Sequence, residues 1–476
     1  MVATLFRLPT ELLEEAFSYL SRQELQSLIF VCKRCADVGR PLLYQYISLE
    51  SGQENVQHTL NLLYREPTIA IKISDAVLTT EPPIGDVPWI LPDFFSYSVN
   101  LRSLELRGFP FSQPHDQGIF NKTLQTKCPK LVKFSYYPGA VRFPESGFEL
   151  SGLRCITWQS SLATIDLKVA PMMTASVESL THISFKGMVV HRADQPYDHF
   201  LKLRFPNLTS LELGSLIQTN TQERTNIAIT EFIMDPRHGL IKHLSLGRKR
   251  SNDMFFQLRG DLLGSDSLPN LQSFEGFPEN VAVMAQCQVR SLFGITSLSL
   301  YCFADANGDF NDVDQMFENI RTNASAIAAP PKLSALQSLR LELSNVHLHH
   351  RMASNVTDIR RLNRMDGFAD MCPGITRWQG NLWPMYAHDF MRMFTMYEHL
   401  ETISVPRLSL IYIGHDPREF FRPVVDQCRN LKRIIAQKPP YTELNHSVYS
   451  FIRDICGDLQ SVTMEHTRDI SMYGAF

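Results

Sequence analysis

Two groups of cysteine and histidine residues are of the types that bind metal ions or carry out thiol chemistry. Cys32 and Cys35 are three residues apart, and further along the chain lie His347, His349 and His350. Structural zinc takes four ligands, usually two cysteine pairs or two cysteines and two histidines. No second pair lies near Cys32 and Cys35, and no cysteine or carboxylate cluster completes the histidine group. We therefore expect no metal site, with both cysteines as structural residues and with His347 and His349 on the solvated side of a strand.

The short motifs that position a catalytic nucleophile, a metal ion or a nucleotide phosphate do not occur in the chain. The sequence contains no P-loop, no G-x-S-x-G, no H-E-x-x-H and no G-x-G-x-x-G. A short basic run, GRKR from Gly247, comes nearest to a phosphate-binding element, and such runs are usually solvated loops. We therefore expect a protein that is not an enzyme, with no catalytic residues and no cofactor.

The composition is that of a folded protein with nearly balanced charge. The chain has 476 residues, of which 44% are hydrophobic and 20% charged, and its net charge is −3. These values exclude disorder of the whole chain and a broad basic surface for nucleic acid or anionic lipid. No apolar run approaches the roughly 18 residues that span a bilayer, and the N-terminus lacks the apolar core of a signal peptide. We therefore expect a cytoplasmic or nuclear protein with no membrane or nucleic-acid partner, whose nine cysteines are free thiols.

The first fifty residues predict three short amphipathic helices. One follows Pro9, a second follows the capping sequence SRQE at residues 21–24, and a third is interrupted by Gly39 and Pro41. Together they carry more apolar side chains than so small a bundle can bury, so we expect a partner protein to cover the remainder. We assign the following residues to that partner-binding surface: Leu8, Pro9, Leu12, Leu13, Phe17, Leu20, Leu25, Leu28 and Cys32.

This segment resembles an F-box, the module that docks the adaptor of Skp–cullin–F-box ubiquitin ligases. LPTELL from Leu8 matches its opening, LQSLIFVCK from Leu25 its second helix, and PLLYQYISL from Pro41 its exit. Cys35 stands where the family often has tryptophan. The smaller cysteine side chain would offer the adaptor less contact area. The resemblance implies that the partner is a Skp-type adaptor and, through it, a cullin.

From residue 100 onward the sequence is repetitive. The pattern L-x-x-L-x-L, with any apolar residue at the marked positions, occurs thirteen times between Leu101 and Leu459, at a mean spacing of about 30 residues. Each core alternates as a short strand does, and the stretches 313–321, 389–397, 418–428 and 446–456 predict helices. This resembles the leucine-rich repeats that follow many F-boxes. A doubly wound α/β enzyme would instead need longer apolar strands and a glycine-rich phosphate loop.

The expected fold is therefore α/β, with a small three-helix F-box followed by a leucine-rich-repeat solenoid. The solenoid would be a horseshoe with a parallel sheet on its concave face. We expect an F-box at residues 1–49, then a linker at 50–99 with a helical segment and a proline-rich connector. An irregular solenoid of about 13 repeats would fill residues 100–476, with inserted loops at 322–331 and 347–367. Four cysteines occupy the same position shortly before a core, where we expect them to be small, buried apolar side chains. They are Cys128, Cys372, Cys428 and Cys456.

The third residue of each core should point onto the concave face, where small or polar types predominate. Such a surface leaves room for a bound protein. Bulky or charged side chains on it are candidate anchors for a target, namely His182, Lys186, Tyr301, Arg340 and Arg377. The resemblance then implies a non-catalytic substrate-recognition subunit of an SCF-type E3 ligase, which binds a target protein for ubiquitination. The alternative is an F-box and repeat scaffold that binds the adaptor without promoting degradation.

Overall fold

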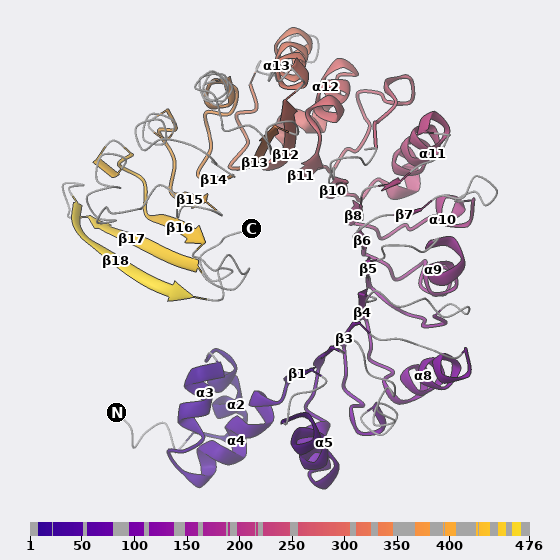
Figure 1. The fold of residues 1–476 in the computed structure, drawn as a ribbon, viewed down its shortest axis with the longest axis vertical. Helices are drawn as coiled ribbons and strands as arrows, with labels where there is room; N and C mark the ends of the chain where they lie inside the picture. The colour runs from indigo at the N-terminus through magenta and orange to yellow at the C-terminus, as the bar shows by residue number, and fades with distance from the viewer. Residues whose placement is uncertain are drawn as a thin grey trace. The chain divides into compact units, whose positions relative to one another are not determined.

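A computed structural model of the chain consists of two units, Met1–Asn220 and Thr221–Phe476, which are described separately (Figure 1). The structure describes residues 8–20, 22–50, 55–79, 95–108, 114–137, 148–159, 165–186, 189–190, 198–214, 216–217, 222–247, 256–304, 311–324, 332–345, 367–380, 394, 396–405, 425–426, 428–437, 446–453 and 459–467.

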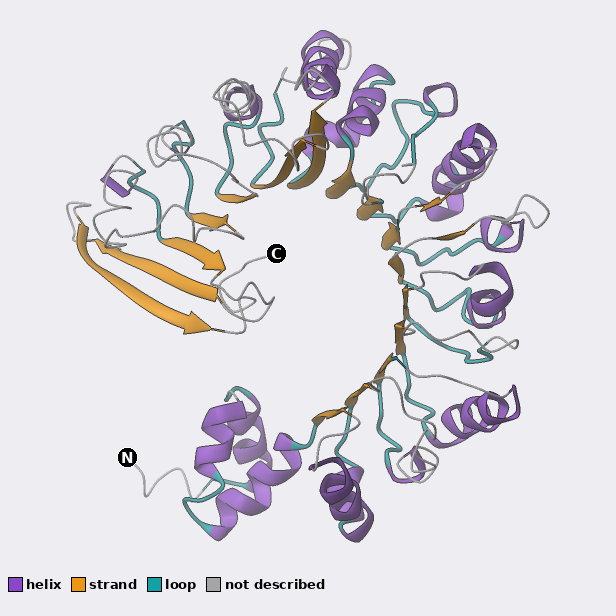
Figure 2. Cartoon of the chain, viewed as in Figure 1, coloured by secondary structure: helices purple, strands orange, loops and turns teal. Residues whose placement is uncertain are grey.

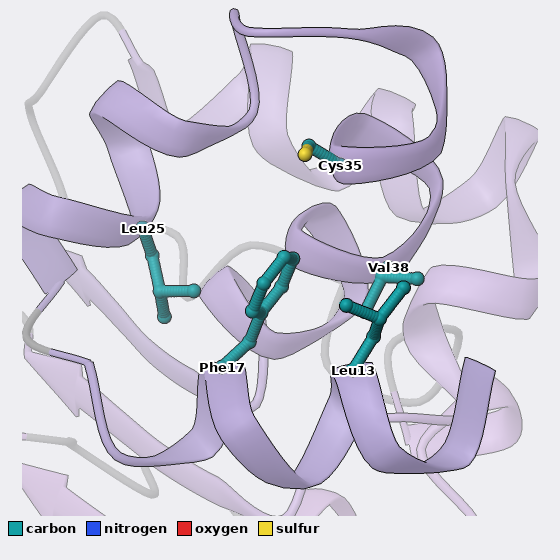
Figure 3. Close-up of a cluster of buried hydrophobic side chains, with 5 residues drawn as sticks. All are labelled: Leu13, Phe17, Leu25, Cys35 and Val38. Atoms are coloured by element: carbon teal, nitrogen blue, oxygen red, sulfur yellow. The ribbon is translucent and has the colours of Figure 1, made fainter. Parts of the chain in front are cut away.

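The first unit begins with three packed helices, α2 (Thr10–Ser18), α3 (Arg22–Leu28) and α4 (Lys33–Leu43). Leu13 and Phe17 are one helical turn apart and point from α2 into the space between the helices (Figure 3). Leu25, Cys35 and Val38 complete the buried cluster. The predicted three-helix module is therefore present, held by a small apolar core.

The third helix is longer than predicted, because neither Gly39 nor Pro41 interrupts α4. Pro41 lies in the last turn, where its missing N–H costs one hydrogen bond and only Leu42 and Leu43 follow within the helix. Gly39 allows a close contact, since a Cβ there would lie 2.8 Å from Cγ2 of Ile29. The interruption expected from residue type was wrong for these positional reasons.

Seven parallel strands follow in the first unit, and their order in the sheet is their order in the chain. They are β1 (Tyr46–Glu50), β2 (Asp75–Thr79), β3 (Ser103–Arg107), β4 (Lys133–Tyr137), β5 (Cys155–Gln159), β6 (His182–Lys186) and β8 (Ser210–Leu213). The helices of the connections are α5 (Asn55–Arg65), α6 (Pro67–Ala70), α8 (Pro114–Lys127), α9 (Ile165–Thr174) and α10 (Asp198–Lys202). A separate parallel pair joins β7 (Val189–Val190) to β9 (Leu216–Ile217).

The sheet starts earlier in the chain than the predicted boundary at residue 100. β2 pairs with β1 on one side and with β3 on the other. The segment before and within β2 in fact fits the repeat pattern, with Ile73, Ala76 and Leu78 buried at the marked positions. The helix expected near residues 56–64 is α5, whereas the proline-rich stretch 81–92 lies outside the described residues.

The second unit continues the strand-and-helix arrangement. Its strands are β10 (His243–Leu246), β11 (Ser273–Gly276), β12 (Ser297–Ala304), β13 (Ser338–Asn345), β14 (Arg377–Gly380), β15 (Thr402–Val405), β16 (Arg433–Gln437), β17 (His446–Arg453) and β18 (Leu459–Thr467). Its helices are α11 (Gln222–Met234), α12 (Pro278–Gln286) and α13 (Asn311–Ala324), with 3-10 turns η1 (Pro236–His238), η2 (Gly260–Leu262) and η3 (Arg290–Gly294). β10 to β16 are parallel. Each of the thirteen predicted cores contains a strand.

The last predicted helix, residues 446–456, is wrong, because this segment forms the strand β17. β17 runs antiparallel to β16 and β18. Tyr449 and Phe451 are buried, while Ile452 is 48% exposed, so burial alternates with the period of a strand. The helix expected at 313–321 is confirmed within α13. The two helices expected at 389–397 and 418–428 lie largely outside the described residues.

In each unit the connecting helices lie against one face of the sheet (Figure 2). The opposite face, here called the polar face, carries the third residue of each core. These residues stand in register as one row in each unit: Ser103, Lys133, Cys155, His182 and Ser210 in the first, and His243, Ser273, Ser297, Ser338, Arg377, Thr402 and Arg433 in the second.

Asparagine side chains tie successive repeats together. The residue just before a core is asparagine at positions 100, 207, 270 and 430. Each amide Nδ2 donates to a backbone carbonyl of the preceding repeat: Asn100 to Ile71 at 2.7 Å, Asn207 to Glu178 at 2.8 Å, Asn270 to Gly239 at 2.7 Å and Asn430 to Glu398 at 3.0 Å. Each acceptor stands two residues before the first apolar residue of its own core. We call these four bonds the asparagine tethers.

Replacing Asn270 with aspartate should loosen the strands that this tether joins. The change keeps the size of the side chain but removes the Nδ2 donor, and one such hydrogen bond is worth about 1 kcal/mol. We expect amides of β10 and β11 to exchange hydrogen about fivefold faster, measured by mass spectrometry. Gln272→Glu, at an exposed side chain nearby, makes the same change in charge and should leave exchange unaltered. Equal exchange in the two variants would show that the tether contributes nothing.

The cysteine positions agree with the prediction where the structure describes them. Cys128, Cys372 and Cys428 are buried before their strands, and Cys456 lies outside the described residues. The Cys128 thiol donates to the Ser98 carbonyl oxygen at 3.5 Å, and the Cys428 thiol to that of Phe394 at 3.2 Å. Eight cysteines are described and all are free thiols. Of the predicted loops, residues 322–324 still belong to α13, while 325–331 and 347–366 lie outside the described residues.

Asp312, in the first turn of α13, should make stability depend on pH. Burial, with a smaller contribution from Glu279, raises the pKa of Asp312 from 3.8 to about 7. The folded protein therefore keeps a proton between about pH 4 and pH 7 that the unfolded chain releases, so this group makes stability fall as the pH rises through that range. Asp312→Asn removes the effect, and the variant should gain about 2 kcal/mol relative to the original protein between pH 5 and pH 8.

Urea denaturation at several pH values measures this difference. Glu318→Gln, at an exposed carboxylate six residues further along α13, is the matched control and should follow the original protein. A constant difference between the Asp312→Asn variant and the original protein across this pH range would contradict the assignment.

Candidate protein-interaction surfaces

The three-helix module exposes a set of large apolar side chains. Phe30 is 85% exposed, Val31 58% and Leu12 48%, and Tyr19 after the end of α2 is also exposed. Phe30 and Val31 occupy the turn between α3 and α4, where the backbone N–H of Val31 donates to the Leu28 carbonyl oxygen at 3.0 Å. Side chains of this size on a small module are the usual mark of a protein-binding surface. We call Leu12, Phe30 and Val31 the exposed apolar set.

The residues assigned to the partner-binding surface from sequence fall into three groups by burial. Leu13, Phe17 and Leu25 form the core, so they hold the helices together and are not available for direct contact. Leu8, Leu20, Leu28 and Cys32 are partly buried against that core. Pro9 and Leu12 are exposed. Leu13, Phe17 and Leu25 therefore do not belong to the apolar surface that is open to a partner. That surface includes Phe30 and Val31, which were not predicted.

Sequence reasoning missed Phe30 and Val31, although a signal was present. Leu25, Leu28 and Ile29 fill the inward face of the second helix, so two further apolar residues directly after them exceed what one helical face can bury. The entry to α2 is fixed from α4, because the Arg34 guanidinium donates to the carbonyl oxygen of Leu8. The exposed apolar set thus lies on a module whose first and third helices are linked by this hydrogen bond.

On the polar face of the first unit, His182 is exposed and its Nδ1 lies 2.7 Å from Oγ1 of Thr181. It stands in register between Cys155 and Ser210. Lys186 ends β6, and its side chain lies outside the described residues. The structure therefore places both predicted anchors on one strand.

On the polar face of the second unit, Arg340 lies in the middle of β13. It is half-buried and in register with Ser299 on β12 and Gln379 on β14. Among the residues that the structure describes, none forms a hydrogen bond or ion pair with its guanidinium. Glu342, two residues further along the same strand, is also half-buried. Arg340 is thus a cation held in the sheet without a charge partner from the described part of the chain.

Buried polar atoms without partners surround Arg340. They are the hydroxyl oxygens of Ser299 and Ser338 and the amide oxygen of Gln379. Ser338 is only 2% exposed. A buried polar atom that makes no hydrogen bond is costly, so such atoms mark places where a further partner is expected. We call Arg340 and these three neighbours the Arg340 cluster. Its guanidinium and the two serine hydroxyls can donate to an acceptor group, whereas the Gln379 amide oxygen can only accept. Arg377 stands one strand away from Ser338 in the same row.

Tyr301 does not serve as a surface anchor. Its side chain is only 2% exposed, its hydroxyl donates to Oε1 of Glu275, and its ring lies 6.1 Å from that of Phe277. Position along the strand put Tyr301 on the polar face, but neighbours from β11 and the residue after it cover the ring. The prediction of an accessible tyrosine is therefore corrected.

No group of three or more metal-binding side chains occurs among the described residues. The histidines at 347, 349 and 350 lie outside them.

None of the helices that the structure describes is long and apolar enough to cross a membrane.

Comparisons with known proteins agree with this arrangement at the N-terminus. The family model of the F-box domain matches residues 5–44. No curated protein matches the chain. Among solved structures, the leucine-rich repeat-containing protein LegL7 from Legionella pneumophila is similar with a TM-score of 0.36 and 11% identity, over 81% of this chain and 92% of that one. Residues 5–44 are thus an F-box domain, and the parallel strand-and-helix repeats behind it are of the leucine-rich-repeat type.

Proposed function

We propose that the chain is a substrate-recognition subunit of an SCF-type E3 ubiquitin ligase. The F-box domain docks a Skp-type adaptor and through it a cullin, while the polar face of the repeats binds a target protein. The observation that carries the proposal is an F-box domain whose exposed apolar set is open to a partner. The ubiquitin-transfer chemistry then belongs to other subunits.

The docking half of the proposal has a clear physical basis. F-box domains as a class bind Skp-type adaptors. Covering an exposed leucine, phenylalanine or valine contributes about 1.5–3 kcal/mol each. Leu12, Phe30 and Val31 together therefore contribute apolar area to such a contact, and the small core of Leu13 and Phe17 keeps them in place.

The target-binding half is supported by the Arg340 cluster. A guanidinium donates in a fixed fork that suits a carboxylate, and charge-assisted bonds of this kind are stronger than neutral ones. Serine hydroxyls beside it can donate to the same anion. We therefore propose that the target presents an acidic side chain to the Arg340 cluster, with Arg377 and His182 as further polar contacts on their own units. Lys186 remains a proposed contact from sequence alone.

Affinity purification of the full chain tests the whole proposal. Adaptor and cullin should be recovered together, and a set of further proteins should increase when the proteasome is inhibited. Recovery of the adaptor without cullin, or with cullin but with no protein that increases, would favour the alternative of a scaffold that does not promote degradation. Failure to recover the adaptor would contradict the proposal at its first step.

Arg340→Glu should reduce recovery of the target about tenfold or more and leave adaptor recovery unchanged. The substitution turns an attraction for a carboxylate into a repulsion at a half-buried site, where screening is weaker than at the surface. Quantitative mass spectrometry of the proteins that increase under proteasome inhibition measures the effect. Lys133→Glu reverses an exposed charge on the polar face of the first unit and is the matched control. Equal loss in both variants would mean that net charge, not the Arg340 cluster, selects the target.

A further inference from the structure

Cys32 and Cys35 are placed for chemistry with each other. Their Sγ atoms are 3.4 Å apart, and the backbone N–H of Cys35 donates to Sγ of Cys32, also at 3.4 Å. Cys32 is the N-cap of α4, with an extended backbone that turns its side chain back over the first turn of the helix. Sequence alone indicated two structural cysteines, but the fold brings both sulfur atoms to one helix N-terminus.

The two thiols differ in access and acidity. Cys32 is only partly buried, and the Cys35 N–H, followed by the Cys35 thiol, lowers the pKa of Cys32. Cys35 is 1% exposed within the core cluster of Figure 3, and its burial raises its pKa to about 11. A thiolate at a helix N-terminus is the reactive form of cysteine. The pair therefore consists of an accessible nucleophile and a buried thiol that can resolve its oxidised form.

We propose that Cys32 and Cys35 form a redox site that a hydroperoxide converts to an intramolecular disulfide. The Cys32 thiolate attacks the terminal oxygen of the hydroperoxide, the O–O bond breaks, and the alkoxide leaves and takes up a proton as the alcohol. Cys32 is then a sulfenic acid. Cys35 gives up its proton and attacks Sγ of Cys32, the S–O bond breaks, and hydroxide leaves with that proton as water. Two thiols are thus oxidised by two electrons and one hydroperoxide is reduced to an alcohol and water.

The two sulfur atoms have to move only a short distance to form the disulfide. The sulfur atoms must approach from 3.4 Å to a bond length of about 2.05 Å, which side-chain rotation at the partly buried Cys32 can supply. The disulfide would lie next to Phe30 and Val31, directly before Cys32 in the chain. The buried thiols Cys128 and Cys302 are unsuited to the first step, since burial raises the pKa of Cys128 to about 12 and that of Cys302 well above its ordinary value.

The test uses the reduced full-length chain, hydrogen peroxide as the oxidant, and mass spectrometry after alkylation and trypsin digestion. Cleavage after Lys33 and Arg34 separates the two cysteines, so the disulfide appears as a cross-link between the peptides 23–33 and 35–65, with a mass about 2 Da below their sum. We expect this cross-link, and loss of the Cys32 thiol at least about tenfold faster than loss of the Cys128 thiol.

Two variants keep the result interpretable. Cys32→Ser should abolish the cross-link and leave Cys35 reduced. Cys35→Ala should halt the reaction at the Cys32 sulfenic acid, which dimedone traps as an adduct. Peptides that remain uncross-linked in the original protein, with Cys32 alkylated as fully as Cys128, would overturn the proposal. A cross-link from Cys32 to any other cysteine would do the same.

Discussion

The double substitution Leu12→Asp and Phe30→Asp is expected to lower the affinity of the full chain for a Skp-type adaptor at least about 100-fold. Scaled by their exposed fractions, covering these two side chains contributes about 2–4 kcal/mol, and 2.7 kcal/mol corresponds to a factor of 100. The carboxylates would also have to be desolvated in the contact. Because Leu12 is 48% and Phe30 85% exposed, the module itself should fold as before. Surface plasmon resonance with the purified adaptor measures the loss.

Leu240→Asp is the matched control for that experiment. Leu240 lies in the second unit and is 46% exposed, close to the value for Leu12, so the substitution makes the same chemical change at similar exposure. Adaptor affinity should not change. If the double variant still bound at full affinity, the exposed apolar set would not be the docking surface. If Leu240→Asp weakened binding equally, the effect would not be specific to the F-box domain.

Phe17→Ala is expected to unfold the three-helix module while the repeats stay folded. Phe17 is 2% exposed among Leu13, Leu25, Cys35 and Val38, and truncating a buried phenylalanine costs about 3–5 kcal/mol. So small a core rarely supplies more than about 3–5 kcal/mol. Amides of α2 and α4 should therefore lose most of their protection in hydrogen exchange on the full chain, while those of β11 and β12 keep theirs.

Phe30→Ala separates the two roles of phenylalanine in this module. The same truncation at an 85% exposed position should change stability by less than about 0.5 kcal/mol but weaken adaptor binding. Protection of α2 that survived Phe17→Ala would show that contacts outside the buried cluster hold the module. Such a contact exists at the Lys72–Glu14 pair, 3.4 Å apart, but exposed pairs contribute little.

Alternation in the sequence was enough to locate the strands of the thirteen cores, because the apolar residues of a core must be buried wherever helices cover that face of the sheet. The same rule wrongly predicted a helix at 446–456. Apolar residues are frequent enough there to fit both the helical period of 3.6 residues and the strand period of two. There the strand is selected by pairing with β16, whose residues lie 9 to 17 positions earlier in the chain. The strand β2 has a weaker pattern, because Ala76 stands at a position where the other cores have larger residues.

Burial at the two candidate surfaces was harder to predict than the strands. Leu12 and Leu13 are adjacent and chemically identical, yet one is 48% and the other 1% exposed, which depends on where α4 crosses α2. Tyr301 is covered through Glu275, 26 residues earlier in the chain. Periodicity places a residue on a face, whereas these outcomes depend on partners that are distant in sequence.

The asparagine tethers have a consequence for how this chain can change over generations. The donor of each tether stands one residue before a core, and its acceptor stands two residues before the preceding core. Both ends of a tether therefore have a fixed position relative to a strand. The chain between those ends can lengthen or shorten without moving either end. A change of length within one of these four connections would therefore leave the strand register as it is, although the tethered repeats differ little in length, with 29, 29, 31 and 32 residues between donor and acceptor.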